Sequence, residues 1–162
     1  MSARLRDLGP GDLGWVHALN QTHATELSSQ TPAAFRALIA RARYARAIED
    51  EGAFLLAFDR RPAPFSPNFD WFQARFERFL YIDRIAVDAR HRRKGLAQAL
   101  YGDLAAFARD AGFQMLAAEV NSDPPNPASD ALHAALGFTV VGEAYLADRD
   151  KTVRYFRLPI LT

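Results

Sequence analysis

The sequence has no cysteine and only two lysines, and neither sign of charge dominates it. Without cysteine the chain cannot form a disulfide framework, a thiolate metal site or a thiol nucleophile. Twenty Lys and Arg residues against nineteen Asp and Glu residues give a net charge of +1. Bulk charge therefore makes no case for nucleic acid or a membrane surface as a partner. Eighteen of the twenty cations are arginines, so local arginine clusters matter more than the total.

Long apolar runs are also missing. The chain contains no run of about 18 apolar residues, and its first residues, MSARLRDLGPGDLG, lack the apolar stretch of a signal peptide. We therefore expect a cytoplasmic protein that does not bind a membrane. A length of 162 residues suits a single domain over 1–162. At this size a fold buries roughly 70% of the surface of the unfolded chain, which is enough for one full core.

The hydrophobic pattern predicts a mixed α/β protein with the element order β-α-α-β-β-β-α-β-α-β-β. Strand 79–87, helix 94–112 and strand 114–120 form a βαβ unit in this order. The other predicted strands cover 3–8, 44–49, 53–59, 138–147 and 151–159, and the other helices start near 12, 32 and 126, with a short helix within 67–76.

One glycine-rich segment matches a dinucleotide-binding motif by spacing alone. The segment from Gly9 to Gly14 fits G-x-G-x-x-G, which in dinucleotide-binding folds follows a buried apolar strand. Here the preceding strand carries Arg4 and Arg6, and no acidic residue closes a second strand about 20 residues later. We interpret the segment as a turn.

A basic turn joins the strand 79–87 to the helix 94–112, and it suits an anion. Backbone N–H groups and the positive dipole at a helix N-terminus bind phosphate, and Gly95 allows close approach to the backbone. The cations around it are Arg90, Arg92, Arg93 and Lys94. The alternative is a solvated basic cap. Because the turn has no Lys-Ser/Thr pair, it lacks the residues with which a P-loop binds magnesium. We therefore do not expect the phosphate to be transferred.

Two motifs carry a resemblance to a known family. Arg92-x-x-Gly95-x-Ala97 resembles the R/Q-x-x-G-x-G/A pyrophosphate loop of the GNAT superfamily of N-acetyltransferases. Further on, Asn126-x-x-Ser129 and Leu136-Gly137-Phe138 resemble the second motif of that family, N-x-x-A/S followed by L-G-F. The resemblance covers residues 79–141 well, and the element order extends it over the whole chain. The sequence is similar to a bacterial branch of predicted acetyltransferases with unassigned acceptors.

The resemblance implies an α/β (α+β) fold with a mostly antiparallel, twisted sheet of about seven strands and about four flanking helices. The strands 79–87 and 114–120 are splayed in this family, with the pantetheine of coenzyme A between them. The implied activity is an acyl-CoA-dependent N-acyltransferase that moves acetyl from acetyl-CoA to a primary amine of a small molecule. Without cysteine, the amine attacks directly in a ternary complex. No metal is required. The expected cofactor-binding residues are Ile85, Ala86, Val87, Arg92, Arg93, Lys94, Gly95, Leu96, Ala97, Asn126 and Ser129.

The chemistry needs a base, because an amine like that of lysine has a pKa of about 10.4 and is protonated at neutral pH. Asp83, on the same strand face as Ile85 and Val87, and Glu119, near the end of the strand 114–120, are the candidates. Each could instead be an ion-pair partner. Where many family members have a tyrosine as proton donor to the thiolate, this chain has His133, which either donates a proton or only packs. Asn126 equally fits a plain helix N-cap.

A cluster of aromatic residues indicates where the acceptor amine binds. Seven of the nineteen aromatic residues lie within 65–81, which suggests a lid over the acceptor pocket; the alternative is that they fill the core. An aromatic wall with a carboxylate suits a cationic amine. The expected acceptor contacts are Asn20, Asn68, Asp70 and Trp71.

Three alternatives stay open at this point. His133 in place of tyrosine supports a coenzyme A-binding sensor or partner module without catalysis. A nucleic-acid binder centred on residues 84–94 is a further possibility, against which the balanced charge argues. The acceptor could also be a peptide or protein N-terminus. The hairpin 138–159 offers an edge for a homodimer.

Overall fold

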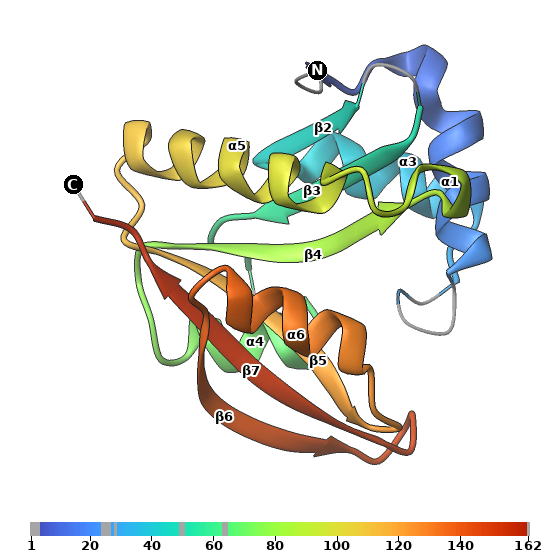
Figure 1. Cartoon of the computed structure of the whole chain (residues 1–162). Coiled ribbons are helices and arrows are strands. Elements are labelled where there is room, and N and C mark those ends of the chain that lie inside the picture. The colour runs from blue at the N-terminus through green and yellow to red at the C-terminus, as the bar shows by residue number, and fades with distance from the viewer. Residues whose placement is uncertain (1–3, 24–26, 28, 49–50, 63–64, 162) are drawn as a thin grey trace. The chain divides into compact units, whose positions relative to one another are not determined.

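The computed structural model describes residues 4–23, 27, 29–48, 51–62 and 65–161. Its seven strands follow the order β1-β2-β3-β4-β5-β7-β6 (Figure 1). Neighbours are antiparallel in the pairs β1/β2, β2/β3, β5/β7 and β6/β7, and β4 and β5 are parallel. The predicted mixed, mostly antiparallel sheet is confirmed. The strands are β1 (Leu5–Asp7), β2 (Tyr44–Ile48), β3 (Ala53–Phe58), β4 (Phe79–Val87), β5 (Met115–Asp123), β6 (Thr139–Leu146) and β7 (Lys151–Pro159).

The described residues form five α-helices, because the short helix predicted within 67–76 is present. The helices are α1 (Leu13–Thr22), α3 (Pro32–Arg41), α4 (Pro67–Gln73), α5 (Leu96–Asp110) and α6 (Pro127–Ala135), with short 3₁₀ turns at Pro10–Asp12 and Ala89–His91. The chain divides into two compact units. The first unit holds Met1–Phe58 and Asp83–Leu104, and the second holds Asp59–Ile82 and Ala105–Thr162. That they form one domain stays a prediction.

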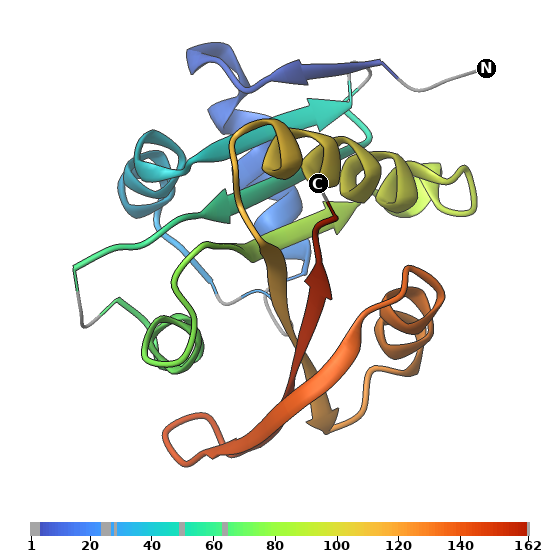
Figure 2. The ribbon, with the colours of Figure 1, turned by 90° about the vertical axis from the view of Figure 1, so that its left-hand side faces the viewer.

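In the first unit, β3 reads AFLLAF and is buried along its whole length, so both of its faces must be covered. Phe54 contacts Trp15 of α1 and Phe35 of α3, with ring centroids 6.4 and 6.0 Å away. Tyr44 of β2 lies on the other face by register, and its hydroxyl donates to Asp103 of α5 over 2.6 Å. Helix α5 therefore covers one face and helices α1 and α3 the other (Figure 2).

The Gly9–Gly14 segment is a structural turn. The buried Asp12 carboxylate accepts two 2.7 Å hydrogen bonds from Arg6, one from the Gly9 amide at 2.8 Å and one from the Trp15 indole at 2.7 Å. The Arg6 hydrogen bonds hold the pKa of Asp12 well below its usual range, although burial opposes them. The turn therefore serves to anchor α1.

In the second unit, the register of β5 with β7 sorts side chains onto two faces. Glu119 lies opposite Tyr155, and Ala118 lies opposite Phe156 on the other face. Helix α4 packs on the Tyr155 face, where Trp71 stacks on Tyr155. Helix α6 packs on the other face through His133, whose ring lies 5.7 Å from that of Phe156. Figure 2 shows the two helices on opposite sides of these strands.

The aromatic segment 65–81 forms core rather than a lid. Ser66 caps α4 by accepting from the Phe69 amide at 3.2 Å, and Pro67 occupies the first helical position. Phe69 and Phe72 are fully buried and contact Phe79 and Tyr81. Opening such a helix would expose both phenylalanines at a cost of about 1.5–3 kcal/mol each. The core alternative is confirmed for these residues.

Candidate functional site

The basic turn lies in the first unit, between the end of β4 and the start of α5. Asp88 accepts from the Arg90 amide at 2.9 Å and from the Arg90 side chain at 3.0 Å, which closes the 3₁₀ turn. These contacts hold the pKa of Asp88 at about 2. Arg92, Arg93 and Lys94 follow and are all exposed. The turn therefore presents three cations to solvent.

Gly95 has the conformation and the clearance that an anion needs. Its φ is +73°, and within the described part of the chain no atom beyond Gly95 and its two chain neighbours lies within 4 Å of the place that a Cβ would take. Leu96 is buried and anchors the helix that starts there, while Ala97 is half-buried. Because the first N–H groups of a helix have no partner inside the helix, they point into this turn. The turn thus has the features expected of a phosphate cradle.

Burial alternates from residue to residue at the end of β4, as predicted. Ala86 is buried, while Ile85 and Val87 are half-buried and share a strand face with Asp83. Pairing of their backbone with pantetheine stays a prediction. In the second unit, the parallel pairs of β4 with β5 run from Phe79↔Met115 to Tyr81↔Ala117, near the start of both nine-residue strands.

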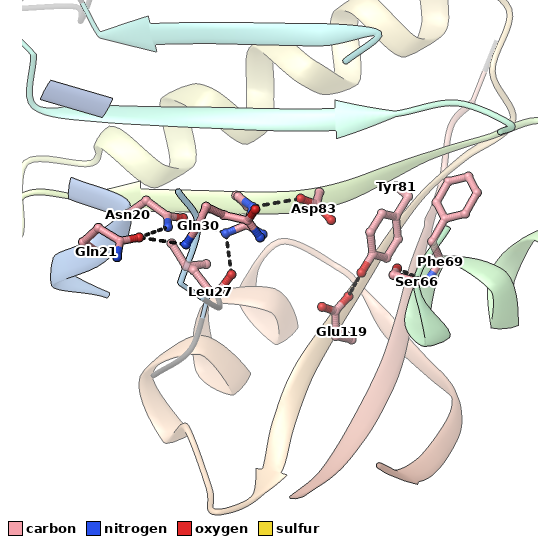
Figure 3. Close-up of polar contacts among 10 residues, drawn as sticks. Asn20, Gln21, Leu27, Gln30, Ser66, Phe69, Tyr81, Asp83 and Glu119 are labelled. Atoms are coloured by element: carbon pink, nitrogen blue, oxygen red, sulfur yellow. Dashed lines mark hydrogen bonds and ion pairs between the residues drawn. The ribbon is translucent and has the colours of Figure 1, made fainter. Parts of the chain in front are cut away.

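Asp83 and Asn20 belong to a buried arginine network in the first unit. Arg84, 6% exposed, donates to Asp83 at 3.0 Å, to Asn20 at 2.7 Å and to the Leu27 carbonyl (Figure 3). Asn20 is fully buried and also donates to Gln21. A buried guanidinium needs a carboxylate partner, so Asp83 neutralises Arg84. Asn20 therefore lies in the core, and its contact with an acceptor stays a prediction.

Glu119 is held by a residue that the sequence analysis missed. The Tyr81 hydroxyl, on a side chain that is 2% exposed, donates to Glu119 Oε2 at 2.5 Å (Figure 3). Both residues lie in the second unit, and Glu119 is half-buried. Tyr81 precedes Asp83 by two residues in the same strand, so the two side chains lie on the same face. This spacing could have identified Tyr81 as a residue of the site.

Two of the other predicted acceptor residues, Asn68 and Trp71, contact Tyr155 on the same face of the second unit. Asn68 is 5% exposed and accepts from the Tyr155 hydroxyl at 2.9 Å. Trp71 is half-buried and stacks on Tyr155 with centroids 4.2 Å apart. Burial is the main cause that raises the pKa of Tyr155 to about 12, and the negative charge of Glu119 is the second cause. Asp70 accepts from the Phe65 amide at 3.0 Å, so it closes the loop before α4.

His133 lies on the opposite face of these strands from Glu119. It is 3% exposed, and its Nδ1 lies 2.7 Å from the Ser129 carbonyl oxygen. Because a carbonyl only accepts, Nδ1 carries the hydrogen. Burial lowers the pKa of His133, although the Ser129 carbonyl opposes this, so the ring is neutral at pH 7. Asn126 accepts from the Ser129 amide at 3.3 Å, which is the N-cap alternative.

No metal site appears among the residues that the structure describes: they contain no group of three or more His, Cys, Asp or Glu side chains that could hold an ion. Among the same residues, no helix has the length and apolar character needed to span a membrane.

Comparison with known proteins identifies the family. No curated protein matches the chain at a significant level. Similar solved structures include Ard1 from Thermoplasma volcanium, with a TM-score of 0.77, 20% identity and full coverage of both chains. The ribosomal-protein-S18-alanine N-acetyltransferase from Escherichia coli has a TM-score of 0.71 at 20% identity, over 99% of this chain and 96% of that one.

A third similar structure is yncA from Salmonella typhimurium with its cofactor acetyl-CoA. Its TM-score is 0.70 at 20% identity, over 100% of this chain and 96% of that one. At such identities these likenesses establish the fold. The model of the acetyltransferase (GNAT) family matches residues 24–138, well over half of the chain. The chain therefore belongs to the GNAT acetyltransferase family and is an N-acetyltransferase.

Proposed function

We propose that this enzyme moves an acetyl group from acetyl-CoA to the primary amine of a small molecule. The observation that carries the proposal is the turn Arg92–Ala97, where exposed cations surround an open glycine at the start of α5. Such a turn suits the pyrophosphate of coenzyme A. The cofactor acetyl-CoA in the yncA structure, on a similar fold, supports the same donor. A cytoplasmic location and a homodimer remain predictions.

The residues favour Glu119 over Asp83 as the base. Asp83 neutralises the buried Arg84, whereas Glu119 is held by the neutral hydroxyl of Tyr81. In the proposed step the ammonium gives one proton to Glu119, and the freed amine nitrogen attacks the thioester carbonyl carbon. The C–S bond then breaks, and the second proton of the nitrogen passes to the departing thiolate as the amide forms. Tyr81 is a positioning residue that holds one carboxylate oxygen.

His133 is not needed for this step. A thiolate with a pKa near 8.5 is a good leaving group, and a neutral imidazole that donates to Ser129 is a poor acid. A proton-donor role for His133 stays a prediction, as does contact of Asn126 and Ser129 with the cofactor.

Binding of acetyl-CoA tests the donor site. We expect calorimetry to give micromolar affinity for the native chain and a loss of about tenfold or more for Gly95→Glu, because a carboxylate would occupy the cradle. Arg92→Ala should weaken binding in the same direction. Gly102→Glu is the matched control, because Gly102 is exposed on α5 and has open space around it. It should bind like the native chain.

Turnover tests the base. With a panel of primary amines and detection of the released thiol, Glu119→Gln should lower kcat/KM by about 10²- to 10⁴-fold while acetyl-CoA binding is unchanged. Glu143→Gln, an exposed glutamate of β6, is the control. A native chain that binds acetyl-CoA but acetylates no amine would be the sensor module. A native chain that does not bind acetyl-CoA would refute both readings.

A further inference from the structure

Asn68 of α4 holds the hydroxyl hydrogen of Tyr155 on β7. The Tyr155 hydroxyl donates to Asn68 Oδ1 at 2.9 Å, and the two residues are 1% and 5% exposed. Asn68 follows Pro67, the first residue of α4, so the start of this helix brings the amide to the strand. A tyrosine hydroxyl carries one hydrogen, so Tyr155 has no second hydrogen for another acceptor. Asn68 therefore decides where this hydroxyl points.

The ring of Tyr155 is fixed by aromatic neighbours. Trp71 stacks on it with centroids 4.2 Å apart and an interplanar angle of 22°, and Phe72 meets it edge-on at 5.3 Å. On β6, a Cβ added to Gly142 would lie 2.3 Å from the Trp71 Cζ2 atom, so the indole itself rests on the backbone of β6. Because these contacts hold the ring, rotation about the C–O bond is what can redirect the hydroxyl hydrogen.

The carboxylate of Glu119 is a second acceptor beside Tyr155. The two residues lie directly opposite one another in the β5/β7 register, where Cβ atoms are about 4.5–5.5 Å apart. Phe72 contacts the rings of both Tyr155 and Tyr81, and the Tyr81 hydroxyl donates to Glu119 at 2.5 Å. The negative charge of Glu119 is, after burial, the second cause of the raised pKa of Tyr155. A Tyr155 hydrogen that Asn68 did not hold would therefore have this carboxylate as its acceptor.

Other charged groups of the second unit also bear on this face. Arg157 of β7 lies two residues from Tyr155 on the same face, by register. The positive charge of Arg75 on α4 opposes the rise in the pKa of Tyr155, which burial dominates. Asp70 of α4 accepts from a backbone amide in the loop before its helix. None of these three residues changes in the variants below, so their effects cancel when the variants are compared.

We propose that Asn68 is a positioning residue that keeps the Tyr155 hydroxyl hydrogen away from Glu119 and so preserves the strength of Glu119 as a base. This inference rests on the proposed function, in which Glu119 takes a proton from the acceptor. A hydrogen bond to a carboxylate stabilises its charged form and makes it a weaker base. Tyr81 already donates one such bond. Asn68 prevents a second bond by accepting the hydrogen of Tyr155.

The acidic limb of the pH profile of kcat/KM tests the role of Asn68. In Asn68→Leu the Tyr155 hydroxyl should turn to Glu119, because a buried hydroxyl without a partner is unfavourable. We expect the acidic limb to move to lower pH by about one unit, which is a tenfold change in proton affinity. Every variant is measured with the same primary amine, so the ionisation of the amine itself cancels. Asn68→Ala also removes the acceptor and answers the question if the leucine variant does not fold.

Removal of the Tyr155 hydroxyl should reverse this shift. In the double variant Asn68→Leu/Tyr155→Phe, the acidic limb should return to its native position, since no hydroxyl is left to donate. Tyr145→Phe is the matched control, because the Tyr145 hydroxyl donates to Asp150 at 2.7 Å at the exposed end of the β6/β7 hairpin. It should not move the limb, alone or together with Asn68→Leu. Urea unfolding shows whether each variant is folded over the pH range used.

Carbon-13 NMR of the glutamate carboxyl carbons follows Glu119 without turnover. The resonance of Glu119 is identified by its loss in Glu119→Gln. In Asn68→Leu this resonance should titrate at lower pH than in the native chain, and in the double variant with Tyr155→Phe it should titrate as in the native chain. A change in packing alone would not depend on the Tyr155 hydroxyl in this way.

A folded Asn68→Leu variant with the native acidic limb and the native titration of Glu119 would overturn the inference while the proposed function stands. A shift that persists in the double variant would also overturn it, because the shift would not pass through the Tyr155 hydroxyl. If Glu119→Gln kept the native kcat/KM, the assignment of the base in the proposed function would fail, and this inference with it.

Discussion

His133 shows how the surroundings of one buried side chain change its chemistry. Its ring lies between Phe138 and Phe156, at 5.0 and 5.7 Å, and its N–H is directed to the Ser129 carbonyl. Burial favours the neutral imidazole and the Ser129 carbonyl favours the charged one, and burial is the larger effect. The residue type alone allows either charge state near pH 7, so only the tertiary environment distinguishes a proton donor from a packing residue.

At this scale we predict that His133→Gln lowers kcat by less than about tenfold, since a proton donor would contribute 10²- to 10⁴-fold. Burial lowers the pKa of His133 in the folded protein, while the unfolded chain has a pKa near 6.5. The unfolded state therefore takes up a proton first as the pH falls, and the native protein loses stability below about pH 6.5. His133→Gln removes this loss.

Urea unfolding at pH 7 and at pH 5 measures the stability that is lost at low pH. The fall in unfolding free energy between the two pH values should be smaller in His133→Gln than in the native chain. An equal fall in both proteins would contradict the neutral, buried histidine. A kcat loss near 10³-fold at full folding would restore the proton-donor role.

The turn from α6 to β6 shows how an element boundary is built from the L-G-F motif. The Gly137 amide donates to the Ala134 carbonyl at 3.1 Å, and the Phe138 amide donates to the His133 carbonyl at 3.0 Å. Gly137 takes a φ of +94°, and Phe138 is buried against His133. This is the left-handed helix end that glycine favours. The motif therefore has a structural reason within the second unit.

We predict that Gly137→Ala destabilises the protein by about 1–2 kcal/mol, because a side chain is strained at this φ and its Cβ would lie 3.4 Å from Leu158. Gly102→Ala is the matched control. Gly102 lies inside α5 with open space around it, so alanine there should stabilise the protein by about 0.5–1 kcal/mol. Denaturant midpoints of both variants give the answer. A neutral Gly137→Ala would show that the helix end can be rebuilt.

At the scale of the whole molecule, two elements are shared between the compact units. Strand β4 gives Phe79–Ile82 to the second unit and Asp83–Val87 to the first, and α5 crosses from the first to the second after Leu104. Neither unit can unfold without losing part of both elements. The predicted single domain is therefore expected to unfold in one cooperative transition.

The two tryptophans test this, because Trp15 lies in the first unit and Trp71 in the second. Trp71→Phe leaves a fluorescence probe in the first unit, and Trp15→Phe leaves one in the second. In each variant the urea midpoint by fluorescence should coincide with the midpoint by far-UV circular dichroism. Midpoints that separate in either variant would show two independently unfolding domains.

The helices, the strands and the basic turn before Gly95 could be predicted from the sequence, because they depend on local rules. The side chains of Thr31 and Ser66 cap their helices by accepting hydrogen bonds from backbone amides three residues later. The basic residues before Gly95 are contiguous in the chain. The short helix within 67–76 and the βαβ unit were also predicted, and the family model confirms the resemblance to the GNAT family.

The contacts of each candidate side chain could not be predicted from the sequence. Asn20 and Asp83 meet the buried Arg84, Asn68 meets Tyr155 87 residues away, and Tyr81 meets Glu119 38 residues away. The physical reason is that hydrogen-bond partners and burial depend on which strands become neighbours. Composition and spacing state which groups are present. The register of the sheet decides which of these groups meet.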